Sequence, residues 1–368
     1  MRAHAPARTE PREHSDVRVE RVQARAYTIP TDFPEADGTA EWDSTTMIVV
    51  HVWGGGAMGM GMGYTYADAS VATLIDTKLA PVVHGNDAMS PRSSWQAMQR
   101  VVRNLGREGL AATAISAVDV ALWDLKAMLL DQPLASLLGR IRDRVPIYGS
   151  GGFTSYDDRR LAKQLAGWVE NDGCRWVKMK IGAEPDRDPV RVAAAKAAIG
   201  GASLFIDANG AYSMRQAQHF AELFAAGQDV RWFEEPVSSD DLPGLRRLRD
   251  TAPAMVEIAA GEYGYTIDYF HRMLAAGAVD VQQADATRCG GVTGFLRAAT
   301  LCEAWHVDLS AHCAPALHRH LGCAVPGFRH VEWFHDHARI EQMLFDGAPV
   351  PKDGAIAPTS AVQVWAWS

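Results

Sequence analysis

Short apolar segments recur along the chain from Val145 onward, and this repetition constrains the fold more than any other feature. The segments are rich in β-branched and aromatic residues, as buried strands are. They start about 22 to 31 residues apart, at 145–148, 176–181, 204–206, 231–233, 256–259, 279–282, 308–311 and 330–333. Helix-like segments lie between them, including 157–171, 188–199, 213–226, 242–251, 267–276 and 291–304. Eight strands that alternate with helices at this period predict a parallel β/α barrel.

A doubly wound open sheet is the alternative for such an alternation of strands and helices. That fold usually begins with a glycine fingerprint in its first strand-to-helix turn. The corresponding segment here, Tyr-Gly-Ser-Gly-Gly-Phe at 148–153, matches that fingerprint poorly. The sequence therefore favours a closed barrel over residues 145–335.

The part of the chain before residue 145 predicts a separate α+β domain over residues 16–144. Strand patterns at 16–29 and 45–52 precede helical patterns at 68–79, 93–105 and 109–129. Residues 1–15 are rich in Arg, Pro, Ala and His, and they predict a disordered tail without the apolar core of a signal peptide. The C-terminal segment 336–368 is expected to return to this first domain.

Two segments of the first domain are candidates for a covering over a site. Residues 31–44 are polar and acidic and contain Pro34 and Gly38, so we expect a long loop that acts as a lid. Residues 53–63 are rich in glycine. A phosphate cradle is the alternative for this stretch, but it lacks a Gly-Lys-Ser/Thr ending and a clear strand–glycine–helix context. A mobile hairpin near a site is therefore favoured.

Composition excludes several classes of partner. The formal net charge is −8 and no basic block is present, which argues against nucleic acid and anionic membrane as partners. No apolar run approaches the ~20 residues that a membrane-spanning helix needs. Five cysteines without a Cys-x-x-Cys pair indicate reduced thiols in a cytoplasmic protein rather than a disulfide framework or a zinc ribbon.

Ionisable side chains mark the C-terminal ends of the predicted strands, where barrels carry their catalytic groups. Acids on three consecutive strands would converge on the barrel axis and repel one another unless a cation neutralises them. Oxygen ligands favour a hard ion such as Mg²⁺, and structural salt bridges at the barrel mouth are the alternative. The polar strand-end residues are Lys178, Lys180, Asp207, Asn209, Glu234, Glu235, Glu262, Asp285, His312 and Glu332.

Lys178 and Lys180 lie two residues apart on one predicted strand, so both ammonium groups point to the same face. An isolated Lys-x-Lys is typical of an edge strand with two solvated lysines, because burying such a pair is costly. The acids on the following strands favour a buried pair instead.

Taken together, these motifs resemble the enolase superfamily, and most closely its mandelate racemase subgroup. The resemblance extends over roughly residues 17 to 368, and it implies a modified (β/α)7β barrel of the TIM type. The α+β capping domain would be completed by the C-terminal segment. The motifs are Val-Lys-Met-Lys at 177–180, Ile-Asp-Ala-Asn at 206–209, Phe-Glu-Glu-Pro at 233–236, Ala-Gly-Glu at 260–262, Asp285 with Cys-Gly-Gly-Val-Thr-Gly at 289–294, Ser-Ala-His at 310–312, and Glu332.

The resemblance also implies a metal centre and a base. One Mg²⁺ ion would be held by Asp207, Glu234 and Glu262, where the first carboxylate of the Glu-Glu pair is the ligand. Lys180 would be the base on one face of the substrate. Lys178 would contact the substrate carboxylate and keep the pKa of that base low.

By the same resemblance, His312 and Asp285 would form an acid/base dyad on the opposite face of the substrate, and Glu332 would hydrogen-bond the second oxygen of an enolate. Asn209 is a candidate for a supporting role near the metal. Ser150 would touch the substrate carboxylate, with a plain turn serine as the alternative, and Arg288 stands where some members carry Lys. We predict surface or loop positions for His318, His320, His335 and His337.

Such a site would remove the proton α to a carboxylate and form a dianionic enediolate. A cation stabilises the developing charge, and a protonated Glu332 would require a raised pKa. His312 is supported in its cationic form by the carboxylate of Asp285. Two opposed acid/base groups permit either a racemase or epimerase of a 2-hydroxy acid, or a dehydratase.

The hydroxyl and carboxyl groups of residues 31–44 suit a polyhydroxy acid better than a phenyl ring. We therefore expect dehydration of a sugar acid to a 2-keto-3-deoxy acid. A lactone-forming cycloisomerase is less favoured, because that branch of the family uses a lysine on the sixth strand, where this chain has Asp285. A metal-free binding barrel and a Schiff-base lyase with Lys180 as nucleophile are further alternatives. The expected partners are a small-molecule carboxylate and, as in relatives, further copies of the chain in a homo-oligomer.

Overall fold

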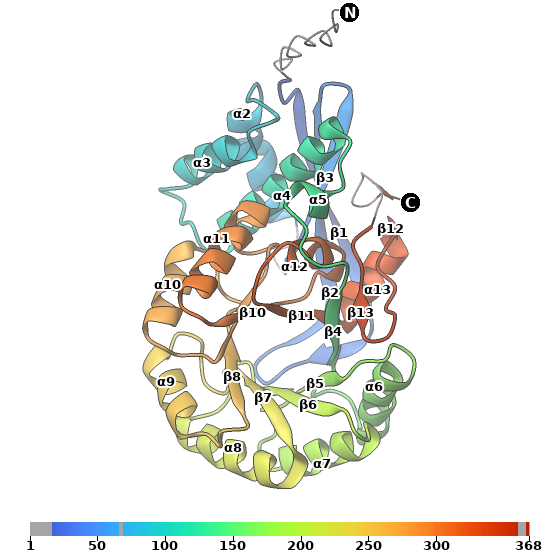
Figure 1. Cartoon of the computed structure of the whole chain (residues 1–368), viewed down its shortest axis with the longest axis vertical. Helices are drawn as coiled ribbons and strands as arrows, with labels where there is room; N and C mark the ends of the chain where they lie inside the picture. The colour runs from blue at the N-terminus through green and yellow to red at the C-terminus, as the bar shows by residue number, and fades with distance from the viewer. Residues whose placement is uncertain (1–16, 66–68, 360–365, 368) are drawn as a thin grey trace, which may run out of the picture.

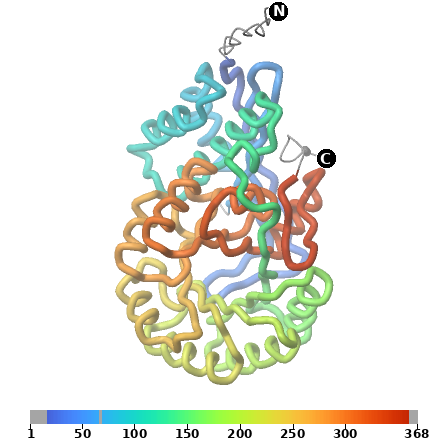
Figure 2. The backbone as a smooth tube through the Cα atoms, in the orientation of Figure 1, coloured from blue at the N-terminus to red at the C-terminus, as the bar shows by residue number. Residues whose placement is uncertain are grey.

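The computed structural model describes residues 17–65, 69–359 and 366–367. The predicted tail at 1–15 lies outside these residues. Two parts are stacked end to end: a cap built mainly from the first third of the chain, and a barrel built from the rest (Figures 1 and 2). The structure confirms the predicted combination of a β/α barrel with an α+β capping domain.

The barrel is a closed sheet of eight parallel strands in sequence order, and β11 pairs with β4 to complete the circle. The strands are β4 (Val145–Gly151), β5 (Trp176–Lys180), β6 (Ser203–Asp207), β7 (Val230–Glu234), β8 (Glu257–Ala260), β9 (Val281–Ala284), β10 (Asp308–Ala311) and β11 (Phe328–Phe334). The connecting helices are α6 (Asp158–Glu170), α7 (Asp188–Ala198), α8 (Met214–Gln228), α9 (Leu242–Thr251), α10 (Ile267–Ala275), α11 (Gly291–Ala304) and α12 (Pro315–Gly322).

Large side chains fill the interior of the barrel. Tyr148, Phe205 and Trp232 pack there as one buried cluster with Ala259 and Val281. The rings of Phe205 and Trp232 are stacked, with centroids 5.0 Å apart. This packed layer excludes water below the strand ends, so charges placed above it interact more strongly than they would in water.

The cap is an antiparallel sheet covered by helices. Its strands are β1 (Arg21–Ala36), β2 (Glu41–Gly54) and β3 (Ala57–Thr65). Its helical segments are α1 (Ser70–Leu74), the π-helix η1 (Ile75–Leu79), α2 (Ala80–Val83), α3 (Pro91–Val101), α4 (Leu110–Leu130) and α5 (Leu134–Leu137). The long helix α4 joins the two parts, because Asp119 accepts hydrogen bonds from the backbone nitrogen and the hydroxyl of Thr293 on α11, both at 2.8 Å.

Glycines in β3 allow that strand to lie directly on α4. A Cβ atom at Gly61 would stand 2.0 Å from the carbonyl oxygen of Ala117, whereas one at Gly63 would have its nearest neighbours at 3.6 Å. We therefore expect Gly61→Ala to lower the free energy of unfolding by about 1–3 kcal/mol or more, since the backbone must shift. Gly63→Ala is the matched control and should be tolerated. Equal denaturation midpoints of the two variants in urea would contradict this packing argument.

The prediction that residues 31–44 form a long loop is wrong. Strands β1 and β2 run through this region as a paired ribbon, and only a short turn at 37–40 separates them. The Asp37 carboxylate stabilises the turn by accepting from the backbone nitrogens of Thr39 and Ala40, at 2.6 and 2.8 Å. Trp42 pairs with Glu35 across the ribbon and donates its indole N–H to that carboxylate at 2.9 Å. The glycine-rich segment 53–63 forms the next hairpin, between β2 and β3.

The C-terminal segment contacts both parts of the molecule. Helix α13 (His335–Leu344) reaches the cap, because Tyr64 donates to Glu341 at 3.2 Å and Arg339 donates to the carbonyl of Pro30 at 2.6 Å. Strand β13 (Ala355–Ile356) instead joins the barrel sheet, antiparallel to β4. Strands β12 (Phe345–Asp346) and β14 (Ala366–Trp367) pair with each other.

All five cysteines are buried free thiols. Within the described part of the chain, no helix has both the length and the apolar composition that crossing a membrane requires.

Candidate active site

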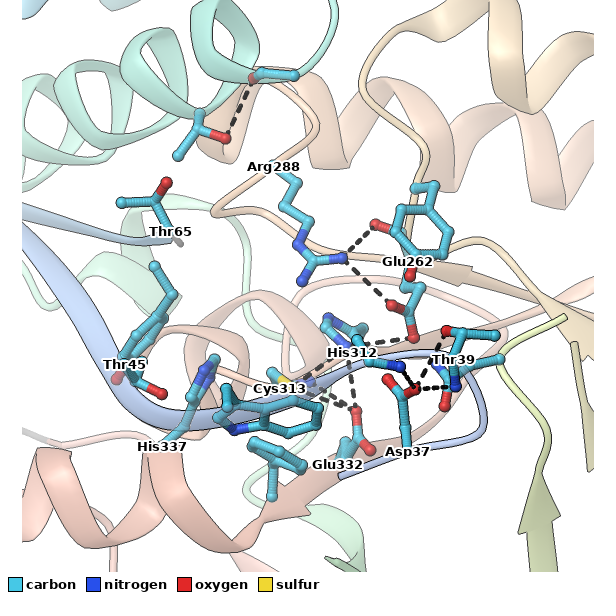
Figure 3. A pocket seen from close by; sticks show the side chains of 18 of the residues that line it. Asp37, Thr39, Thr45, Thr65, Glu262, Arg288, His312, Cys313, Glu332 and His337 are labelled. Carbon is cyan, nitrogen blue, oxygen red and sulfur yellow. Dashed lines mark hydrogen bonds and ion pairs between the residues drawn. The ribbon is translucent and has the colours of Figure 1, made fainter. Parts of the chain in front are cut away.

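The polar strand ends meet the cap at a cavity of about 670 Å³. Lys180, Glu262, His312 and Glu332 line it from the barrel, while Thr39 and Trp42 line it from the β1–β2 ribbon. Figure 3 shows the cavity from close by, with Glu262, Arg288 and His312 on one side and Thr45 and Thr65 on another. The site is therefore built from two sources, with ionisable groups from the barrel and hydroxyl and aromatic groups from the cap.

Three carboxylates converge beside this cavity, as the strand ends predicted. Asp207 ends β6, Glu234 ends β7, and Glu262 follows β8. One oxygen from each of these buried acids lies within 4.8 Å of the others. Among the described residues, the buried Oε2 of Glu262 finds no hydrogen-bond partner. A set of three oxygen donors, one of which makes no hydrogen bond within the described residues and has only the His312 imidazole 3.5 Å away, fits a hard divalent cation.

Two lysines neutralise part of this acidic cluster. The Nζ atom of Lys178 lies 2.6 Å from Glu234 and 3.3 Å from Asp207. Lys180 reaches Asp207 at 2.6 Å and Asn209 at 2.9 Å. Burial would raise the pKa of Asp207, but the two ammonium groups lower it to about 2. Burial and the charge of Asp207 together raise the pKa of Glu234 well above its ordinary value.

The expected lowering of the Lys180 pKa does not occur in this arrangement. Burial and the positive charge of Lys178 both act in the expected direction, but the Asp207 carboxylate outweighs them and raises the pKa above its ordinary value. The ion pair between Lys180 and Asp207, at 2.6 Å, determines that the pKa of Lys180 rises. The spacing of residues along a strand does not reveal that distance. The free side chain is therefore held as an ammonium group.

His312 and Asp285 are in contact, as the predicted dyad requires. The Nδ1 atom of His312 lies 2.8 Å from Asp285. Asp285 also accepts from the backbone nitrogen and the hydroxyl of Thr287, both at 2.7 Å. Although burial opposes it, the hydrogen bond with His312 holds the pKa of Asp285 well below its usual range. This arrangement directs Nε2 of His312 toward Glu262, at 3.5 Å.

Glu332 lies at the end of β11 between the lysine and the histidine. It accepts from the hydroxyl of Ser150 at 2.6 Å and from the backbone nitrogen of Cys313 at 3.0 Å, and it lies 2.8 Å from Lys178. The predicted rise in its pKa is wrong for this arrangement. Burial alone would raise the pKa of Glu332. The positive charges of Lys178 and His312 outweigh burial and hold this pKa well below its ordinary value.

Comparison with known proteins identifies the family. Residues 23–139 match the N-terminal domain of mandelate racemase/muconate lactonizing enzymes, and residues 160–362 match the enolase C-terminal domain-like family. The chain belongs to the mandelate racemase/muconate lactonizing enzyme family of the enolase superfamily.

Two solved structures of relatives superpose on nearly the whole of this chain. A mandelate racemase/muconate lactonizing enzyme-like protein from Rubrobacter xylanophilus superposes with a TM-score of 0.90 at 53% identity, over 93% of this chain and 94% of the other. A racemase from Streptomyces coelicolor with bound magnesium gives a TM-score of 0.89 at 31% identity, over 95% and 97%.

Curated relatives include enzymes that act on sugar acids. The 3,6-anhydro-alpha-L-galactonate cycloisomerase of Streptomyces coelicolor is 34% identical over 85% of this chain and 88% of its own length. L-talarate/galactarate dehydratase of Salmonella typhimurium is 33% identical over 66% of this chain and 62% of its own length. The family is thus established, while the reaction differs among its members.

The remaining predicted site residues support the central groups of this enolase superfamily site. Arg288 donates to the backbone oxygen of Glu262 at 3.1 Å and to its carboxylate at 3.4 Å. Its guanidinium lies over the ring of Tyr263, 5.7 Å from the centroid. Ser150 is fully buried and binds Glu332, so it orients that carboxylate. Asn209 contacts Lys180 and lines the cavity.

Three histidines that were expected on the surface or in loops are buried instead. His337 lines the cavity and stacks on Tyr64, with ring centroids 3.5 Å apart. His318 accepts from the backbone nitrogen of Ala286 at 3.0 Å, and His320 is fully buried. His318 and His320 lie on α12, a helix that is absent from the predicted elements. Pro315 at its first turn, with Leu317 and Leu321 four residues apart, was the available helix signal.

Proposed function

We propose that this protein removes the proton α to the carboxylate of a sugar acid and dehydrates the acid to a 2-keto-3-deoxy acid. The observation that carries the proposal is that Lys180 at the end of β5 and His312 after β10 reach one cavity beside the Asp207, Glu234 and Glu262 cluster, with β4 and β11 between their strands. Two such groups can act on the α-carbon and on a neighbouring oxygen of the same substrate. The homo-oligomer expected from sequence stays a prediction.

The acid cluster would hold one Mg²⁺ ion. Its charge would stabilise the carboxylate oxygens as the enediolate forms. Lys178 and Glu332 lie next to the cluster and are placed to orient the same carboxylate. The fit rests on the oxygen donors and on the orphaned Oε2 of Glu262. Magnesium-bound relatives support the same choice of ion.

Lys180 must lose its proton before it can act as a base. The ion pair with Asp207 opposes this loss, and that opposition would weaken if the Asp207 oxygens held a cation instead. Lys178 then remains as a neighbouring positive charge that favours the neutral amine. Asn209 accepts from Lys180 at 2.9 Å and keeps its nitrogen at the cavity wall.

His312 would act as the general acid. The Asp285 carboxylate holds Nδ1, so Nε2 is the nitrogen that faces the cavity, where it lies 3.2 Å from Sγ of Cys313, and from there it would donate a proton to the departing β-oxygen. The bond between the β-carbon and its oxygen breaks, and the protonated oxygen leaves as water. The electron pair of the enediolate forms the new C=C bond between the α- and β-carbons. The enol that results converts to the 2-keto acid. The hydroxyl groups of Thr39, Thr45 and Thr65 line the cavity where the other substrate hydroxyls would lie.

Cycloisomerisation is the second candidate, because the Streptomyces coelicolor relative bears that name and aligns over 85% of this chain. Asp285 disfavours only the cycloisomerase branch that carries a lysine on the sixth strand. In this alternative the leaving oxygen belongs to a ring of the substrate itself. Proton removal by Lys180 is the same in both reactions. They differ only in the C–O bond that breaks when His312 protonates the leaving oxygen.

Product mass separates the candidates. A panel of mono- and di-acid sugars and their anhydro or lactone forms, incubated with Mg²⁺ in deuterated water, should give a keto acid that has lost one water from an open-chain acid. A keto acid that has lost no water, and that differs in mass from its substrate only by the deuterium taken up from solvent, would indicate a cycloisomerase. Exchange at the α-carbon without a new carbonyl group would indicate a racemase. Absence of both keto acid formation and α-exchange on every acid would contradict the proposed chemistry altogether.

A further inference from the structure

A second cluster of potential metal ligands lies outside the active site, where the cap ribbon meets the start of α13. One ligand atom each from Asp32, Glu35 and His335 lie within 4.8 Å of one another. Asp32 and Glu35 belong to β1, and His335 is the first residue of α13. Asp32 and the Nε2 atom of His335 are 3.0 Å apart. Two carboxylates and an imidazole from distant parts of the chain thus face one point.

Unsatisfied oxygens indicate that this point lacks a ligand. Glu35 is 1% exposed, and its Oε1 finds no hydrogen-bond partner anywhere in the described part of the chain. The neighbouring Asp336 is 0% exposed, and its Oδ2 likewise has no partner within the described residues. Buried carboxylate oxygens without a partner are rare, because their desolvation is costly.

The local charges leave a negative excess. Three carboxylates, from Asp32, Glu35 and Asp336, face two guanidinium groups. Arg160 lies 3.4 Å from Asp32. Arg339 lies 2.6 Å from Oδ1 of Asp336, which leaves the Oδ2 atom of that residue without a partner among the residues described. Burial first, and then the charge of Asp336, raise the pKa of Glu35 to about 8. With the neighbouring imidazole of His335 neutral, a proton on Glu35 or a bound cation would offset this excess.

We propose that Asp32, Glu35 and His335 form a site for one divalent transition-metal cation, with zinc as the probe. Mixed imidazole and carboxylate ligands suit such ions, whereas the all-oxygen cluster in the barrel suits magnesium. Asp32 and His335 line a surface groove of about 500 Å³, which gives the ion a path from solvent. The groove also leaves room for water at a remaining coordination position.

This site would act on the active site through Trp42. The second oxygen of Glu35 accepts the indole N–H of Trp42 at 2.9 Å, and Trp42 lines the catalytic cavity. The Trp42 ring also packs edge-on against Phe153, with centroids 5.7 Å apart. A cation between β1 and α13 would therefore fix the ribbon that forms one wall of the cavity. Its binding does not depend on which reaction the barrel catalyses.

Zinc binding in excess Mg²⁺, measured by equilibrium dialysis of the whole chain, tests the proposal. Glu35→Gln and His335→Asn should each weaken zinc binding by at least about 100-fold, the upper range for loss of a partner around a metal. His271→Asn, on the exposed face of α10, is the matched control and should bind zinc normally. His312→Asn should also keep this zinc equivalent, which separates it from zinc captured in the active site.

Thermal unfolding gives a second readout. Zinc should raise the Tm of the unmodified chain and of His271→Asn, but not of His335→Asn, whose half-buried side chain can be replaced with little disturbance. Equal zinc affinity in all four variants, or loss in His312→Asn alone, would overturn the proposal. A higher Tm for Glu35→Gln, with no response of the unmodified chain to zinc, would also overturn it, because the amide then mimics a protonated Glu35.

Discussion

Lys180→Met should lower turnover by about 10²–10⁴-fold on any substrate of this protein, the range that one positioned acid or base contributes. Methionine has a similar length, so it fills the space beside Asp207 without restoring a base. Magnesium affinity is measured alongside turnover, because Lys180 shares Asp207 with the proposed metal site. Loss of turnover with retained magnesium binding is the expected result.

His312→Asn provides the comparison on the opposite face of the cavity. If Lys180 removes the α-proton, solvent deuterium should enter the α-position in His312→Asn without product formation, and it should not enter in Lys180→Met. The reverse pattern would mean that the histidine is the base, with the lysine as the acid. Full turnover of Lys180→Met would show that neither assignment holds.

Glu234→Gln should weaken magnesium binding by at least about 100-fold, since it removes one of three charged ligands while keeping the side-chain shape. The change also removes the carboxylate that Lys178 contacts at 2.6 Å, so the lysine keeps only Asp207 and Glu332 as counter-charges. Titration calorimetry with Mg²⁺ measures the effect without any knowledge of the substrate.

Glu235→Gln is the matched control, because Glu235 is the adjacent buried acid but lies outside the converging cluster. We expect it to retain magnesium affinity within a small factor. Equal losses of magnesium affinity in the two variants would show that the combined negative charge of Glu234 and Glu235 holds the ion, rather than the position of Glu234. A loss confined to Glu235→Gln would transfer the ligand role to that residue.

The barrel could be predicted because its signal is repetitive and local. Each strand is buried on both faces, so it appears in the sequence as an apolar run, and the polar residue at its end marks the mouth of the barrel. That rule gives acids at the ends of three consecutive strands, while the choice of Glu234 over Glu235 came from the family resemblance. The convergence of Asp207, Glu234 and Glu262 requires only that parallel strands end at one level, which the closed sheet provides.

The incorrect predictions have a different cause. The ribbon at 31–44 is held by backbone pairing and by the contacts of Asp37 and Trp42, so its polar side chains carry no strand signal. The buried positions of His318 and His337 are set by elements far away in sequence. The pKa values of Lys180 and Glu332 depend on ion-pair distances, and residue spacing does not encode these.

The turn at 37–40 has a consequence for how new specificities can arise in this protein. It places Thr39 at the cavity while belonging to the cap, whereas the groups proposed to transfer protons belong to the barrel. Substitutions in the ribbon can therefore exchange the groups that meet the far end of a substrate and leave the reacting atoms where they are. The residues that would select among acids and the residues that would break the C–H bond lie in separate segments of the chain, so the two sets can change independently during evolution.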